Sequence, residues 1–126
     1  MSDFVALLHA SFLVADLKKS RVFYEEVLGL VPNPARPEMD FAGEWYDVGA
    51  AQIHLICQPN PDPTSERPMH GGRDRHTALG VKNWDALRAR LDAAWLVYTL
   101  SKSGRRALFV RDPDGNTLEL IAVEEC

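Results

Sequence analysis

The chain has 126 residues, a formal net charge of -4 and a pI of about 5.5. This length suits one compact domain with an adequate hydrophobic core. The acidic balance argues against the basic surface needed to bind nucleic acids or anionic membranes, and the apolar runs are far shorter than the ~20 residues of a membrane span. The two cysteines, Cys57 and Cys126, are too few for a disulfide framework, so we expect a protein of the reducing cytoplasm.

The pattern of the first half, residues 4–58, predicts a module with the order βαβββ. Asp16 is placed to cap a helix that continues to about Leu28, and Gly29 suits the left-handed conformation that often ends a helix. A proline-rich, irregular passage follows the helix. Apolar alternation predicts strands at 4–15, 44–49 and 51–58.

Residues 59–74 form a linker, because four prolines and two glycines make regular structure unfavourable there. The second module, residues 75–123, repeats the plan of the first. Asn83 is placed to cap its helix, and Trp95 lies where a glycine is more usual, so we expect an irregular helix end. Strands are predicted at 75–82, 96–101, 106–111 and 117–123.

The two modules repeat each other in sequence, and the repeat aligns four possible metal ligands. The segment HASFLVADLKKSR, which begins at His9, matches HTALGVKNWDALR, which begins at His76. The segment QIHLI, which contains His54, matches TLELI, which contains Glu119. Two such modules packed about a pseudo-two-fold axis would bring these four side chains together. Three imidazoles and one carboxylate suit a divalent transition metal.

Alternation along the strands places the four candidate ligands on one face of a sheet, with the helices on the other face. This predicts an α+β fold with a concave, partly polar cavity around the ligands. The residues that we expect to line the substrate cavity are Trp45, Arg106 and Phe109. We interpret His70, which has no counterpart in the repeat, as a solvated linker residue. The arginines of the linker and of the last hairpin are interpreted as solvated charge or as contacts to an anionic substrate, namely Arg67, Arg73, Arg75, Arg105, Arg106 and Arg111.

The helix sequence DLKKSRVFYEEVLGL and the closing sequence RDPDGNTLELI resemble the vicinal oxygen chelate superfamily. This superfamily includes glyoxalase I, bleomycin resistance proteins, fosfomycin resistance proteins and extradiol dioxygenases. The resemblance covers about residues 5–123 and implies one domain, whose two βαβββ modules form a curled mixed sheet. That sheet would make an open cup around a metal, with the helices on its outer face. The resemblance also implies a small-molecule substrate and a homodimer whose site can be shared between chains.

Within the superfamily, the chain is most similar to bacterial glyoxalase I. In those enzymes the first and fifth strands supply histidines, which match His9 and His76 here. The fourth and eighth strands supply glutamates, and these positions hold His54 and Glu119. Glu119 matches the catalytic base of the family. The histidine at position 54 raises the charge of the site by one and removes a possible second base.

The resemblance and the ligand set together predict a metal-dependent, glyoxalase-I-like lyase or isomerase. A bound Zn, Ni, Co, Mn or Fe would polarise a small vicinal-oxygen substrate, such as the hemithioacetal of a thiol conjugate. Glu119 would transfer the proton through a metal-stabilised enediolate. An Fe(II) extradiol-type dioxygenase, with His9, His76 and Glu119 as its triad, is one alternative. A fosfomycin-type transferase and a non-catalytic, ligand-sequestering protein of the bleomycin-resistance type are the others.

Overall fold

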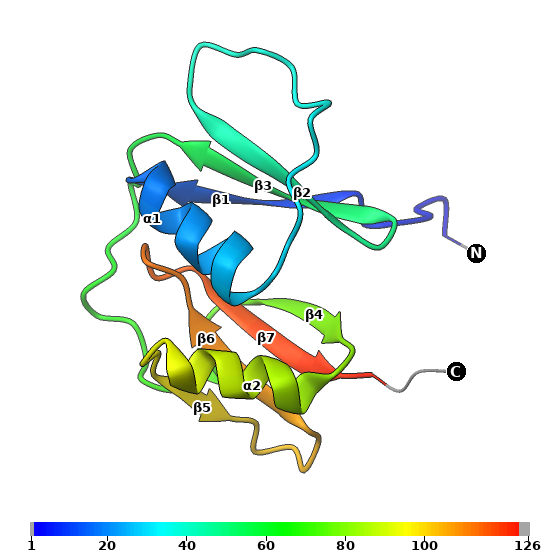
Figure 1. The fold of residues 1–126 in the computed structure, drawn as a ribbon, viewed down its shortest axis with the longest axis vertical. Coiled ribbons are helices and arrows are strands. Elements are labelled where there is room, and N and C mark those ends of the chain that lie inside the picture. Colours follow the sequence, from blue (N-terminus) through cyan, green and yellow to red (C-terminus); the bar gives the residue numbers. More distant parts are fainter. Residues whose placement is uncertain (1, 124–126) are drawn as a thin grey trace.

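The computed structural model describes residues 2–123, which form two modules joined by a linker (Figure 1). The first module contains β1 (His9–Val14), α1 (Leu17–Arg21), η1 (Val22–Val27), β2 (Gly43–Val48) and β3 (Ala51–Cys57). The second contains β4 (Thr77–Val81), α2 (Trp84–Ala93), β5 (Tyr98–Leu100), β6 (Ala107–Arg111) and β7 (Thr117–Ala122), and η2 (Gly71–Arg73) lies in the linker. Over the described range, no helix has the length and apolar character needed to cross a bilayer.

Each module has its own open, mixed sheet. In the first module β3 pairs in parallel with β1 and antiparallel with β2, which gives the order β1-β3-β2. In the second module β7 pairs in parallel with β4 and antiparallel with β6, which gives the order β4-β7-β6-β5. The predicted α+β class and mixed pairing are confirmed, with two separate sheets within one chain rather than one continuous sheet.

The first module contains the three strands whose ranges the sequence predicted, and only a trace of the fourth strand of the βαβββ plan. Where a fourth strand would lie, a single antiparallel bridge joins Pro32 to Tyr46, and Asn33 N donates to Trp45 O at 2.7 Å. Pro32 has no N–H, and two further prolines follow it within five residues. Proline cannot donate to a strand ladder, so pairing stops after one bridge. The first module therefore has three full strands, and the fourth strand of the βαβββ plan is reduced to this single bridge.

The first strand also begins later than predicted, at His9 instead of residue 4. Its partner β3 begins at Ala51, which the register places opposite Leu8, so residues 4–7 extend beyond the end of that strand. Leu8, which the alternation predicts to pack under the helix, is 71% exposed. Three further apolar side chains of this segment are almost fully exposed, namely Phe4, Val5 and Leu7.

The helix boundaries follow the sequence signals closely. The Asp16 side chain accepts hydrogen bonds from two backbone N–H groups of the first turn, as a helix cap does. Gly29 has a positive φ of 82° just after the helix ends. Asn83 precedes α2 at the predicted position but makes no side-chain cap bond. Trp95 adopts a φ of 60°, which is the irregular helix end expected from the sequence.

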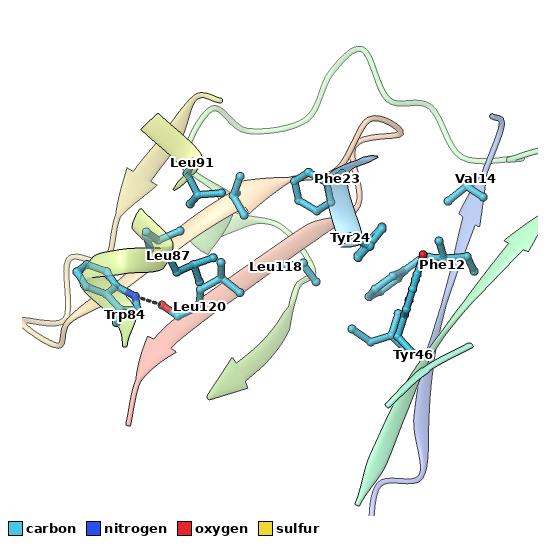
Figure 2. Close-up of a cluster of buried hydrophobic side chains, with 14 residues drawn as sticks. Phe12, Val14, Phe23, Tyr24, Tyr46, Trp84, Leu87, Leu91, Leu118 and Leu120 are labelled. Carbon is cyan, nitrogen blue, oxygen red and sulfur yellow. Dashed lines mark hydrogen bonds between the residues drawn. The ribbon is translucent and has the colours of Figure 1, made fainter. Parts of the chain in front are cut away.

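One continuous hydrophobic core joins the helices to the inner faces of both sheets. Figure 2 shows Phe23 and Tyr24 of η1 between Tyr46 of the first sheet and Leu118 of the second. The Tyr24 hydroxyl donates to Asp112 Oδ2 at 2.7 Å, which links the two modules through a buried hydrogen bond. The helices thus cover one face of each sheet, and the candidate ligands lie on the other.

Candidate metal and substrate site

His9, His54 and Trp45 form an aromatic stack on the sheet face of the first module. Strand register places Trp45 of β2 directly beside His54 of β3. The Trp45 and His54 ring centroids are 4.3 Å apart with an interplanar angle of 5°. On the other side of His54, the His9 ring lies 3.9 Å away at 14°. The stack fixes the orientation of the His54 ring.

A chain of hydrogen bonds determines which nitrogen of His54 carries the proton. Asn33 Nδ2 and Gln52 Nε2 both donate to Asp47, so the amide oxygen of Gln52 points away from that carboxylate. This oxygen lies 2.9 Å from His54 Nε2. Because an amide oxygen only accepts, Nε2 is the donor and Nδ1 keeps the lone pair of the neutral ring. Burial, with the neighbouring His9, lowers the pKa of His54, which favours this neutral form.

His76 and Glu119 form the second pair, on the sheet face of the second module. Glu119 is 5% exposed, and its Oε1 lies 3.2 Å from His76 Nε2. His76 Nδ1 lies 2.8 Å from the carbonyl oxygen of Asp74. A carbonyl oxygen accepts only, so Nδ1 carries a proton and donates it. In the neutral ring, the Nε2 lone pair therefore faces a carboxylate.

This arrangement of His76 and Glu119 fits a metal site. Two electron-rich atoms face each other at close range, so either a proton on Nε2 or a cation must lie between them. A metal-binding histidine commonly donates its other ring N–H to a backbone carbonyl, as His76 does to Asp74. The donor set of imidazole and carboxylate is one that divalent transition metals prefer.

Arg105 also belongs to this half of the site, where the sequence indicated only a solvated charge or a contact to an anionic substrate. Its Nη2 lies 3.2 Å from Glu119 Oε2, so the two carboxylate oxygens contact different partners. Arg105 belongs to the loop between β5 and β6, and no position in the repeat corresponds to it. The neighbouring residue Arg106, which we predicted to line the cavity, lies on the other face of the sheet. It pairs with Asp85 and covers the Trp84 ring at 5.2 Å, beside α2, which does not support a role in substrate binding.

Phe109 lies where the sequence placed it, beside the candidate ligands. The strand register pairs it with Glu119, and its ring meets the His76 ring edge-on at 5.0 Å. On its other side lies His70, 5.1 Å away. His70 Nδ1 is 2.7 Å from Thr99 Oγ1, so this histidine is held in place instead of lying free in solvent as we expected.

A polar pocket of about 250 Å³ opens next to His76. Its walls come from β1, the linker and the first residues of β4 and β7, and they include Ser11, Asn60, Arg67, Arg75 and Thr117. Arg67 donates to Asp74, which also accepts from Arg111. Burial opposes ionisation of Asp74, but these two guanidinium groups outweigh it and hold its pKa at about 2. The pocket therefore presents two guanidinium groups beside a candidate ligand, each paired with a carboxylate: Arg67 with Asp74, and the exposed Arg75 with Asp62.

The single chain brings the four predicted ligands together only in pairs. His9 contacts His54 in the first module, and His76 contacts Glu119 in the second. Within residues 2–123, no three His, Cys, Asp or Glu side chains gather into a metal-binding cluster. Completing a four-ligand site would require the faces of two modules to meet.

The sequence is similar to two curated proteins. It is 27% identical over 120 residues to glyoxylase I 4 from Arabidopsis thaliana, covering 91% of this chain and 69% of that protein. It is 32% identical over 126 residues to lactoylglutathione lyase from Haemophilus influenzae, covering 91% of this chain and 90% of that protein.

The fold is likewise shared with a solved structure, a glyoxalase family protein from Bacillus anthracis. The two structures superpose with a TM-score of 0.75 at 20% sequence identity. The match covers 98% of this chain and 100% of that chain. A family model for the Glyoxalase/Bleomycin resistance protein/Dioxygenase superfamily matches residues 6–120, nearly the whole chain. The two modules, their mixed sheets and this match lead to one conclusion: the chain belongs to the Glyoxalase/Bleomycin resistance protein/Dioxygenase superfamily.

Proposed function

We propose that this protein is a metal-dependent lyase or isomerase of the glyoxalase type, acting on a small substrate with two adjacent oxygens. The observation that carries the proposal is the His76–Glu119 pair. His76 directs an imidazole nitrogen at a buried carboxylate 3.2 Å away, and its other nitrogen is fixed by a backbone carbonyl. The curated relatives, a glyoxylase I and a lactoylglutathione lyase, support this class of reaction.

Four side chains of the chain would hold the metal: His9, His54, His76 and Glu119. When bound, the metal supplies Lewis-acid polarisation of a substrate oxygen. Glu119 is the proposed base, since a carboxylate oxygen at the metal can accept the proton next to a carbonyl and return it to the adjacent carbon. The neutral His54 cannot act as a second carboxylate base, so one residue would both remove and return the proton.

The pocket beside His76 is the proposed substrate site. Arg67 and Arg75 at its wall would hold an anionic part of the substrate, such as a carboxylate of a thiol conjugate. Ser11 and Thr117 add small hydroxyl groups that leave room near His76. These residues bind and orient the substrate, and they leave the proton transfer to Glu119.

We further propose that the metal site is completed by a second copy of the chain. In one chain the two ligand pairs lie on separate sheets, and both β1 and β4 are edge strands. The exposed apolar segment 4–8 extends from one of these edges, and burying it against a second copy would remove its side chains from water. A homodimer would then place His9 and His54 of one copy against His76 and Glu119 of the other.

The experiment that tests the function is metal analysis combined with turnover. Protein purified without chelator should contain about one Zn, Ni, Co, Mn or Fe per chain by elemental mass spectrometry. The variants His76→Ala and Glu119→Gln should lose this metal, and the control variant His70→Ala should keep it, because His70 contacts Phe109 and Thr99 instead of the ligands. The metal-loaded protein should convert the hemithioacetal formed from methylglyoxal and a thiol.

One observation favours a second candidate function, an Fe(II) dioxygenase. Since His54 Nε2 is bonded to Gln52, a shell of only His9, His76 and Glu119 would be a two-histidine, one-carboxylate triad. Iron content with oxygen uptake on catechols would identify this activity, and thiol transfer to fosfomycin would identify a transferase. Protein that takes up no metal even after reconstitution would contradict all of these metal-dependent functions. The non-catalytic, ligand-sequestering function would then remain.

A further inference from the structure

Two adjacent arginines of the β5–β6 loop point to opposite faces of the second sheet. Arg105 Nη2 lies 3.2 Å from Glu119 Oε2, on the face of the candidate metal site. Arg106 pairs with Asp85 on the face covered by α2. The chain thus contains two neighbouring guanidinium groups, of which only one can affect Glu119.

We propose that Arg105 is the counter-ion of Glu119 in the metal-free protein and that an entering divalent cation displaces it. The inference rests on the proposed function, because it assigns Arg105 a role at the same metal site. It makes Arg105 a positioning residue that competes with the metal, and it makes the affinity for the metal lower than the ligands alone would provide.

The environment of Glu119 explains why the metal-free carboxylate needs a partner. The side chain is 6% exposed, so water hydrates it poorly, and an ionised carboxylate without compensation is unfavourable there. One carboxylate oxygen faces His76 and the other faces Arg105. A divalent cation bound to Oε1 beside His76 would share the carboxylate with Arg105 and repel the nearby guanidinium.

The environment of Arg105 explains why displacement costs little. Its side chain is 58% exposed, so the guanidinium is readily hydrated once it leaves Glu119. Its remaining contacts are weak and local, with Arg105 Nε 3.4 Å from Ser103 Oγ. Ion pairs with one exposed partner contribute little net free energy, so the competition is modest but measurable.

The test is a zinc titration against a competing fluorescent chelator, using the wild-type protein, Arg105→Gln and Arg106→Gln. We expect Arg105→Gln to bind zinc about two- to fivefold more tightly than wild type, the range that corresponds to an exposed ion pair. Arg106→Gln should bind zinc like wild type. Equal or weaker zinc binding by Arg105→Gln would overturn the proposal, and weaker binding would mean that Arg105 holds Glu119 in place for the metal.

A second measurement follows Arg105 directly in the wild-type protein. Side-chain 15N NMR signals of Arg105 should shift when zinc is added, and those of Arg106 should not. Unchanged Arg105 signals in zinc-saturated protein would contradict displacement while leaving the metal-dependent function intact. If no variant binds zinc at all, both the metal-dependent function and the displacement are wrong, so the two failures are distinguishable.

Discussion

His54 combines two environments that rarely occur together in one side chain. Its ring lies between the parallel rings of Trp45 and His9, and its Nε2 donates to Gln52. The first environment suits a stacking residue, and the second leaves only Nδ1 for a metal. His54 can therefore be a metal ligand only through Nδ1.

Replacing His54 with phenylalanine separates stacking from ligation. His54→Phe keeps an aromatic ring in the stack but removes both nitrogens, so we expect metal affinity to fall at least about tenfold, since even the loss of an outer partner costs that much. Isothermal titration with zinc measures the change. The matched control, Trp45→Leu, disturbs the stack without removing a nitrogen and should lower the affinity less than His54→Phe does. Wild-type affinity in His54→Phe would instead support the three-ligand shell of the dioxygenase alternative.

The sequence repeat identified His9, His54, His76 and Glu119 and predicted that all four would meet, whereas the chain brings together only His9 with His54 and His76 with Glu119. The repeat could not reveal Arg105, His70 or Asp74 as neighbours of the ligands. These side chains lie in loops or at strand ends, where position depends on how the chain turns rather than on a regular period. Arg106 illustrates the limit, since one residue of difference in such a loop changes the face to which the side chain points.

At the scale of elements, two buried tyrosine hydroxyls hold the first helix against the sheets. Tyr24 of η1 donates to Asp112, and Tyr46 of β2 donates to Glu25 of η1. Burial, strengthened by these carboxylate acceptors, raises the pKa of both hydroxyls well above 10. Both tyrosines therefore stay protonated in the folded chain when exposed tyrosines ionise.

These raised pKa values predict a loss of stability in alkali. The two tyrosine hydroxyls contribute fully to the free energy of unfolding at pH values below the unfolded-state pKa of about 10. Above that pH their contribution is progressively lost, because only the unfolded chain then releases the protons. Each tyrosine should lower the free energy of unfolding by about 1.4 kcal/mol per pH unit above pH 10. Urea unfolding between pH 9 and 11.5 measures the slope. In Tyr46→Phe the slope should be smaller by the contribution of one tyrosine. An unchanged slope would contradict the raised pKa of Tyr46.

The elements themselves were largely predictable from local signals. Asp16 and Gly29 mark helix ends by their own conformational preferences, the absence of a glycine at Trp95 predicted an irregular end, and the structure agrees at each of them. The first strand and the missing fourth strand of the first module were not predictable in this way. A strand needs a partner along its length, but the apolar run at residue 4 lies beyond the end of β3, and the passage around Pro32 pairs through a single bridge.

At the scale of the whole molecule, one core joins the modules while the ligand pairs remain apart. The buried bond from Tyr24 to Asp112 and the bond from Asn116 Nδ2 to Leu13 O both cross between the modules. The modules are therefore held in one arrangement, and rotation of one module within the chain is not an easy way to unite the ligands. The second copy proposed above would supply the missing pair without such a rotation.

Mixing two inactive variants tests the shared site. One variant carries His9→Ala and His54→Ala, and the other carries His76→Ala and Glu119→Gln. Each alone should bind no metal, but a mixed dimer contains one site built entirely from unaltered ligands. Metal analysis of the co-expressed, doubly tagged mixed dimer should therefore find about one metal per two chains. A mixed dimer without metal, beside a metal-containing wild type, would show that each site forms within one chain.

The division of the ligands between two modules has a consequence for how the protein responds to its own abundance. If each site spans two copies, metal binding and association are linked equilibria, and each strengthens the other by the same factor. At low protein concentration the copies would separate, and each half of the site would keep only two ligands, which are too few to retain the ion. Dilution alone would then release the metal, so the protein would become fully loaded only above a threshold amount in the cell.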